Sequence, residues 1–284
     1  MSAGPAQAGA RPGSVTAEAG RARRHACRAE FAKSASLHST WWLLLAVAGL
    51  TVVLGAAAVG TVDTDQCRTP SSCHEDTVKL SLTGVWVGQT AVAVFGVLAV
   101  AGEYGTGTMR VTLAAMPDRT RVVAAKASVV AALTAVSALL AVAGSVAVGR
   151  VLLSDAGFTR ANGYEPLSLA DGATARAAFG SVVYLMLVAL LSVGLAFVVR
   201  DTAGAIGGVL GLLYAFPVAA SLVSDDAWKE WLTRLAPASA GLAVQSTRDL
   251  DKLAIAPWPG LGVLSLYAAG ALVLGGFVLC RRDA

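Results

Sequence analysis

The sequence predicts an all-α polytopic membrane protein with six transmembrane helices, cytoplasmic N- and C-termini, a short cytoplasmic helix and outer interfacial helices. Hydrophobic residues make up 56% of the 284 residues and charged residues only 14%, whereas about 25% of the residues of a soluble domain are charged. The charges are also spaced so that six long windows contain none. A soluble core of six buried helices is excluded, because it would need a polar exterior that this chain lacks.

The six charge-free windows are each 23 to 29 residues long, and a spanning helix needs about 20 residues. A charge at the bilayer centre costs about 2.5–3.5 kcal/mol on insertion scales, so such windows are typical of segments that lie in lipid. The windows lie between Lys33 and Asp63, Lys79 and Glu103, Lys126 and Arg150, Arg176 and Arg200, Asp201 and Asp225, and Lys252 and Arg281. Pro217 falls inside the fifth window, where a proline is expected to kink the helix.

The segments that flank the windows alternate in charge. One set carries 13 basic and 6 acidic residues, and the other carries 9 basic and 12 acidic residues. The first set is 1–40, 102–126, 200–201 and 281–284, and the second is 62–81, 149–177 and 224–258. Because Lys and Arg concentrate on the cytoplasmic side, the chain is expected in the plasma membrane with both termini in the cytoplasm. The net charge of +4 reflects this asymmetry, so no nucleic-acid partner is expected.

The chain before the first window divides into two parts. Residues 1–20 are rich in Ala, Gly, Pro and Ser, which predicts a disordered tail. Residues 21–40 are basic and are expected to form a helix along the inner membrane surface, in contact with lipid; a solvated basic linker is the alternative. Trp41 and Trp42 then lie at the headgroup level and open the six-helix transmembrane domain, residues 41–282.

The first outer segment contains Cys67 and Cys73, separated by five residues that include Pro70. An oxidising exterior permits a disulfide between them, and two free thiols are the alternative.

The third outer segment contains an apolar stripe at helical spacing. Trp228, Trp231 and Leu235 recur every three or four residues among charged ones. The pattern predicts an amphipathic helix on the outer interface, with tryptophan at its edge.

Residues 102–126, GEYGTGTMRVTLAAMPDRTRVVAAK, link the second and third windows. Their first glycines and threonines resemble a phosphate-binding loop, but that loop requires G-x-x-x-x-G-K-[ST], and Thr108 follows Gly107 here. A dinucleotide-binding loop requires a preceding strand, whereas a spanning helix precedes this one. The chain itself is therefore expected to bind no nucleotide or other cofactor.

Catalytic and metal-binding residues are not predicted either. His25, His38 and His74 are scattered without ligand spacing. No window contains Asp, Glu, Lys, Arg or His near its centre, although intramembrane proton relays and proteases rely on such residues. The pattern disfavours an ion-driven carrier and a membrane enzyme.

The remaining interpretation of residues 102–126 is a structured cytoplasmic link that holds a short helix between two spans. Thr106 to Ala115 can form a short helix, Pro117 ends it, and Asp118 can cap the next helix. Glu103 ends the second span and is expected to pair with a cation at the start of the third. The candidate cations are Arg119, Arg121 and Lys126.

This stretch resembles the cytoplasmic loop of permease subunits of ATP-binding-cassette (ABC) transporters of the type-2 export class. Those loops show an acidic residue, then Gly-Thr, a Leu-rich turn, Pro-x-Arg and an Ala-Lys that opens the third span. The matching positions are Glu103, Gly107, Thr108, Leu113, Pro117, Arg119, Ala125 and Lys126. Residues 191–217 (LSVGLAFVVRDTAGAIGGVLGLLYAFP) and 235–241 (LAPASAG) are similar to two further stretches of that family, before its fifth and sixth spans.

The resemblance implies two permeases, identical or paralogous, with two copies of a separate ATP-binding subunit that carries ATP and magnesium. Substrate would be exported, and ATP binding would push a cytoplasmic coupling helix. The residues expected to couple to that subunit are Glu103, Gly107, Thr108, Leu113, Met116, Pro117, Arg119 and Lys126, with Leu113 and Met116 as the apolar contacts. The alternatives for the chain are a stand-alone ion-coupled carrier and a non-catalytic membrane anchor or sensor. The alternative for the charges of residues 102–126 is that they serve only as replaceable membrane anchors.

Overall fold

A computed structural model describes residues 12–64, 75–116, 118–162 and 164–281, and the regular structure in these ranges is helical. Six of its helices are long and apolar enough to cross a membrane, and each contains most of one charge-free window. They are α2 (His38–Val59), α4 (Val85–Gly105), α6 (Arg119–Asp155), α7 (Gly172–Val199), α8 (Thr202–Leu222) and α11 (Pro257–Arg281). The chain is therefore a multi-pass, all-α membrane protein.

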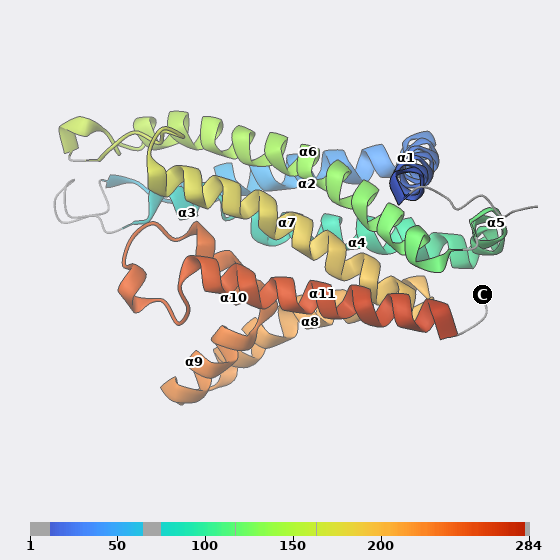
Figure 1. The fold of residues 1–284 in the computed structure, drawn as a ribbon. Helices are drawn as coiled ribbons and strands as arrows, with labels where there is room; N and C mark the ends of the chain where they lie inside the picture. Colours follow the sequence, from blue (N-terminus) through green and yellow to red (C-terminus); the bar gives the residue numbers. More distant parts are fainter. Residues whose placement is uncertain (1–11, 65–74, 117, 163, 282–284) are drawn as a thin grey trace, which may run out of the picture.

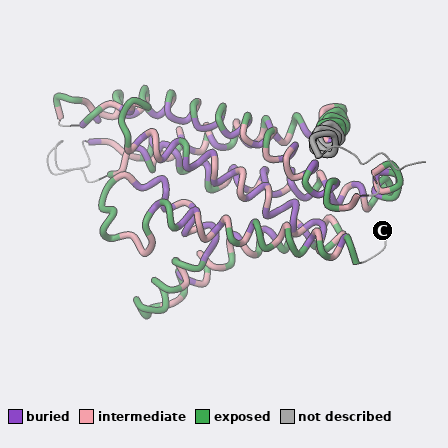
Figure 2. The backbone as a smooth tube through the Cα atoms, in the orientation of Figure 1, coloured by how far each residue is buried: buried purple, intermediate pink, exposed green. Residues whose placement is uncertain are grey.

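The six long helices run side by side along one axis, with α7 near the middle (Figure 1). Helix α7 packs against α4, α6, α8 and α11, and α2 packs against α4 and α6. Burial follows this arrangement, because α4 and α7 are the most enclosed spans and α8, α11 and α2 the least. In Figure 2 the buried backbone accordingly concentrates inside the bundle and the exposed backbone on its outside. The outward apolar faces are those that lipid or another protein would cover.

Two glycines allow α7 and α11 to cross closely. A Cβ added to Gly194 on α7 would lie 2.5 Å from the carbonyl carbon of Ala271, and one added to Gly275 on α11 would lie 2.7 Å from the oxygen of Gly194. Small residues at helix crossings let backbones approach in membranes, where packing rather than burial from water holds helices together.

The connections at one end of the bundle form a cap of short helices, called here the α9 end (Figure 1). They are α3 (Thr77–Ser81), η3 (Arg160–Asn162), α9 (Asp226–Leu235), α10 (Pro237–Leu242), η4 (Ala243–Gln245) and η5 (Leu250–Lys252). Asp225 caps α9 by accepting from two backbone amides, and Trp228 and Trp231 are exposed on it. The helix expected from the tryptophan spacing is thus present.

Asp76 ties two of these connections together. Its carboxylate accepts from the backbone N–H of Lys79, which caps α3. It also accepts from the backbone N–H and hydroxyl of Thr247, at 2.6 and 2.7 Å, and from the N–H of Arg248. This one partly buried carboxylate therefore joins the segment before α4 to the segment before α11.

The opposite end, called here the α5 end, carries α1 (Pro12–Ser36) and α5 (Thr108–Ala115). Helix α1 is seen end-on in Figure 1 while α2 runs across the view, so α1 lies across the bundle axis. Leu37 separates α1 from α2 in an extended conformation. This orientation is the one expected of a helix that lies along a membrane surface.

Two expected boundaries differ in the structure. Helix α1 begins at Pro12, inside the range 1–20 that composition predicts as a tail, and residues 1–11 lie outside the described part. Helix α2 begins at His38, so the expected helix over 21–40 is divided between two helices. Composition alone does not reveal that segment 12–20, PGSVTAEAG, belongs to a helix, because glycine and the β-branched Val15 and Thr16 have low helix propensity.

Two further expectations concern a proline and a disulfide. Pro217 lies inside α8, as the fifth window required. Cys67 and Cys73 both lie outside the described residues, so their pairing stays a prediction. Cys27 and Cys280 are free thiols.

Candidate functional site

The link between α4 and α5 turns at Gly107, whose φ of +73° is the left-handed conformation that glycine adopts without strain. The Thr106 hydroxyl donates to the oxygen of Gly102 at 3.0 Å, which closes the end of α4. The Thr106 and Thr108 hydroxyls lie 2.9 Å apart. This turn starts α5 at Thr108 rather than at Thr106, and directs the helix away from the line of α4.

The next turn leads from α5 into α6. Asp118 caps α6, since its carboxylate accepts from the Thr120 hydroxyl at 2.7 Å and from the backbone N–H of Arg121. The hydrogen bond from Thr120, with that from Arg121, holds the pKa of Asp118 below its usual range. Pro117 lies outside the described residues, and α5 ends before it at Ala115, as predicted.

Helix α5 turns two residues inward and keeps others exposed. Met109 and Thr112 are buried, and Leu113 is partly buried and packs against the core. Val111 is the large apolar residue that α5 presents to the outside, with 70% of its surface exposed. Leu113, expected to contact the ATP-binding subunit, therefore packs partly against the protein interior. Val111 was missed because the sequence does not show which side of this short helix faces outward.

Lys126, on the first turns of α6, is at the centre of a buried ion-pair cluster. Its ammonium lies 2.7 Å from a carboxylate oxygen of Glu30 on α1 and 2.7 Å from Oε1 of Glu103 on α4. It also donates to the oxygen of Ala99 at 3.3 Å. Only 2% of its side chain is exposed. The pairing of Glu103 with a cation, predicted from sequence, is thus present, and Lys126 is that cation.

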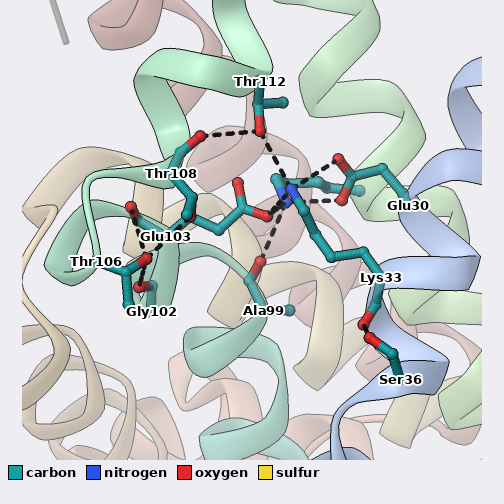
Figure 3. Close-up of polar contacts among 10 residues, drawn as sticks. Glu30, Lys33, Ser36, Ala99, Gly102, Glu103, Thr106, Thr108 and Thr112 are labelled. Carbon is teal, nitrogen blue, oxygen red and sulfur yellow. Dashed lines mark hydrogen bonds and ion pairs between the residues drawn. The ribbon is translucent and has the colours of Figure 1, made fainter.

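Lys33 on α1 extends the cluster to α5. Its ammonium also binds Oε1 of Glu103, and it donates to the hydroxyl of Thr112 at 3.1 Å. Figure 3 shows the ammonium group of Lys33 between the carboxylates of Glu103 and Glu30, with Thr112 of α5 above it. The charge cluster, defined as Glu30, Lys33, Glu103 and Lys126, therefore connects four helices, α1, α4, α5 and α6.

Sequence reasoning missed Glu30 and Lys33. Both lie in the segment interpreted as a basic surface helix, although Glu30 is 4% exposed. A signal was available, because Glu30 is the sole acidic residue between Arg21 and Lys33. A buried charge is retained only with a partner, but its partner Lys126 is 96 residues away.

Arg119 and Arg121 do not join the charge cluster. The Arg119 guanidinium donates to the carbonyl oxygens of Leu279 and Cys280, at 2.6 and 3.3 Å, at the end of α11. A cation is favourable there because it satisfies terminal carbonyls and opposes the helix dipole. Arg121 pairs with Asp118 at 2.7 Å on the surface. The three expected cations thus have three different partners.

A second guanidinium lies at the same end of α11. Arg200, in the left-handed conformation with φ of +62°, ends α7. It donates to the oxygen of Val278 at 3.2 Å and lies over the ring of Tyr104 on α4. Together with Arg119, it fixes the end of α11 against α4, α6 and α7.

A surface groove lies beside the junction of α5 and α6. It has a volume of about 460 Å³ and is lined by His25, Ala26, Ala29, Ala115, Met116, Asp118 and Arg121. Met116, expected to be an apolar contact, lies in this groove and is partly buried.

Comparison of the sequence with protein-family models and with curated proteins gives no match. The fold and the charge cluster are therefore the basis for assigning a role. They establish a polytopic membrane protein in which a short helix at one end is joined through Thr112 and the charge cluster to three longer helices.

Proposed function

We propose that this chain is the transmembrane permease subunit of an ABC transporter of the type-2 export class. It moves a substrate outward across the plasma membrane with energy from ATP that a separate subunit hydrolyses. The observation that carries the proposal is the attachment of α5 to the bundle through Thr112 and the charge cluster. The resemblance of residues 102–126 to the loops of such permeases is the second support.

In this proposal α5 is the coupling helix and the α5 end faces the cytoplasm. The exposed Val111 and the groove beside Met116 are the surfaces offered to the ATP-binding subunit. A push on α5 reaches Lys33 through Thr112. It then reaches Lys126 through Oε1 of Glu103, which accepts from both ammonium groups. Because separation of buried ion pairs is costly, α1, α4 and α6 respond with α5 rather than independently of it.

The remaining partners follow from the same proposal. The outward apolar faces of α8 and α11, the least buried spans together with α2, are available to a second permease copy or paralogue and to membrane lipid. The ATP-binding subunit supplies nucleotide and magnesium, and this chain supplies the transport path and the coupling helix.

A stand-alone ion-coupled carrier is the second candidate, because buried charges are the feature that such carriers use. Here Glu103 is two residues from the end of α4, and Lys126 is seven residues after the start of α6. Both charges are thus at one end of the bundle, and each forms ion pairs with the other and with a residue of α1. This position favours a structural joint over an ion path through the membrane centre.

The test is to co-express this chain with each candidate ATP-binding subunit encoded in the same genome and to purify the pair through a tag on one chain. The proposal expects a stable complex whose ATPase rate in proteoliposomes depends on this chain. Absence of a complex, together with proton or sodium movement by this chain alone in proteoliposomes, would support the carrier and reject the permease.

A further inference from the structure

Helix α1 has an outward side that the charge cluster does not use. Arg24, Arg28, Phe31 and Ala35 follow one another at intervals of four, three and four residues, which places them along one side of the helix. Arg24, Arg28 and Phe31 are exposed, whereas Glu30 is buried in the charge cluster. The four residues are called here the outer row of α1.

The outer row presents two positive charges that the protein leaves unneutralised. Neither Arg24 nor Arg28 has an ion-pair or hydrogen-bond partner among the described residues, whereas Lys33 of the same helix pairs with Glu103. Side chains four residues apart on a helix are neighbours, with Cβ atoms about 5–6 Å apart. Guanidinium groups bind phosphate oxygens through paired N–H donors. Two of them at this spacing can therefore hold one phosphodiester group between them.

The outer row lies next to the lipid-facing surface of α2. The indole nitrogen of Trp41, on the first turn of α2, donates to the carbonyl oxygen of Ala35 at 3.0 Å. Tryptophan at the end of a span lies at the depth of the lipid head groups. From there α2 continues as a span with Leu45 and Val53 exposed. The row is therefore at head-group depth and is continuous with a surface that faces the lipid chains.

The direction of α1 and the aromatic ring in its outer row favour a membrane as the partner. Helix α1 lies across the bundle axis (Figure 1), so the whole row stays at one depth. Phe31, with 49% of its surface exposed, is part of the same row as the two cations. Exposed aromatic and basic residues on a helix that lies flat are typical of binding to anionic lipid. An acidic protein surface would satisfy the charges but would not account for the continuity with α2.

We propose that the outer row of α1 binds an anionic phospholipid, of the phosphatidylglycerol type, in the leaflet at the α5 end. The guanidinium groups of Arg24 and Arg28 donate to its phosphate oxygens, and Phe31 packs against the upper part of its chains. The lipid thereby holds α1 at the membrane surface, and with it the half of the charge cluster that α1 supplies. This inference is independent of the ATP-binding subunit, because it requires only that the six spans lie in a membrane.

The test uses the purified full-length protein in detergent with equal amounts of phosphatidylglycerol and phosphatidylcholine of identical chains. Both lipids contain the phosphodiester, but the choline cation cancels its charge in phosphatidylcholine. Each cation near an anionic surface favours binding by about five-fold. After washing, the retained lipid should contain phosphatidylglycerol over phosphatidylcholine by about twenty-fold, as measured by mass spectrometry. The preference should largely disappear in about 1 M salt, where charges are screened within about 3 Å.

An arginine of α5 provides the matched control. Arg110 is exposed and has no ion-pair partner among the described residues, but α5 lies further along the bundle axis than α1 (Figure 1). Arg24→Gln and Arg28→Gln should each lower the preference by about five-fold, whereas Arg110→Gln should keep it. The unfolding midpoints of the three variants should equal that of the parent, because the three side chains are exposed.

Two results would overturn the proposal. Equal retention of the two lipids by the parent protein would leave the outer row to an acidic protein surface. An equal loss of preference in Arg24→Gln and Arg110→Gln would show that the overall positive charge of this end, and not the outer row, selects the lipid.

A soluble competitor separates a lipid from a free phosphodiester. Glycerophosphoglycerol has the head group of phosphatidylglycerol without its chains, and it should not displace the lipid at a concentration equal to that of the lipid. Displacement under that condition would show that the two arginines select a soluble phosphodiester, which contradicts the assignment to a membrane lipid.

Discussion

Glu103 and Lys126 are 23 residues apart in the sequence, and their carboxylate oxygen and ammonium are 2.7 Å apart inside the protein. The two residues come from opposite ends of the link that contains α5. Their contact closes this link into a loop whose base is an ion pair. The loop is fixed further by Glu30 and Lys33 from α1, which pair with the same two residues.

Removal of the central cation should strongly destabilise the fold. Lys126→Met leaves Glu30 and Glu103 buried with Lys33 alone, and loss of one partner of a buried ion pair costs about 3–5 kcal/mol. Thermal unfolding in detergent should show a lower midpoint, and Lys126→Arg should recover part of the loss. Lys79→Met changes an exposed lysine and is the control. A midpoint for Lys126→Met equal to that of Lys79→Met would contradict the structural role of the cluster.

Val111→Asp should leave folding intact and weaken the proposed complex. The side chain is exposed on α5, and exposed substitutions usually change stability by less than about 0.5 kcal/mol. If α5 docks on the ATP-binding subunit, a buried charge at the interface should reduce affinity by about ten-fold or more. The affinity is measured with purified subunits.

Leu169→Asp is the matched control for Val111→Asp, since Leu169 is also exposed but lies in the connection between η3 and α7. It should bind the ATP-binding subunit as the parent does. Leu113→Asp should instead lower the yield of folded protein, because Leu113 packs against the core. Parent-like binding of the ATP-binding subunit by Val111→Asp would contradict the assignment of α5 to the interface.

The two ends of the bundle should lie on opposite sides of the membrane. Single cysteines at positions 111, 165 and 249 in a cysteine-free background test this. Val111 is chosen rather than Thr112 because Thr112 is buried and a labelling reagent must reach the new cysteine. An impermeant thiol reagent added outside intact cells should label positions 165 and 249 but not 111, as the excess of basic residues in segments 1–40 and 102–126 predicts. Labelling of position 111 from outside would reverse the proposed orientation.

Asp76→Ala should destabilise the α9 end. The carboxylate caps α3 and accepts three hydrogen bonds from Thr247 and Arg248, so its loss removes a helix cap and leaves those donors without an acceptor. A cost of about 1–3 kcal/mol is expected. Asp76→Asn retains one oxygen, so its stability should lie between that of the parent and that of Asp76→Ala. The measurement is unfolding in detergent. Asp251→Ala, also in that region, is the control and should be near neutral.

Gly194→Ala should disturb the crossing of α7 and α11. The added methyl would overlap the backbone of Ala271 and Leu272, and overpacking of this kind costs about 1–3 kcal/mol. Gly276→Ala, on α11 itself, meets no atom within 4 Å and should be neutral or slightly stabilising through helix propensity. Equal unfolding midpoints for the two variants would show that the helices separate readily at this point.

The sequence predicts the spans well because their signal is local. The absence of charge between Lys79 and Glu103 indicates that these residues themselves lie in lipid. Helix α4 occupies most of this window. The end of α5 at Ala115 and the cap at Asp118 are local for the same reason. The expected pair of Glu103 with a cation needed only the two flanks of one short link.

The rest of the candidate site was not predictable from spacing, because its contacts join distant segments. Nothing near Glu30 indicates that Lys126 is its partner, and nothing near Arg119 indicates the carbonyl of Leu279, 160 residues later. The choice between Val111 and Leu113 as the outward residue depends on how α5 is rotated, and Gly107 and the Lys33–Thr112 contact fix that rotation.

The contact between Arg119 and the end of α11 has a consequence for biosynthesis. Arg119 is synthesised at the start of the third span, but the carbonyls of Leu279 and Cys280 exist only when the last residues of the sixth span have left the ribosome. Until then, the first five spans wait in the membrane without the helix that Arg119 and Arg200 hold in place. A chain truncated within α11 before Val278 therefore lacks these contacts of Arg119 and Arg200 at the α5 end, far in sequence from the truncation itself.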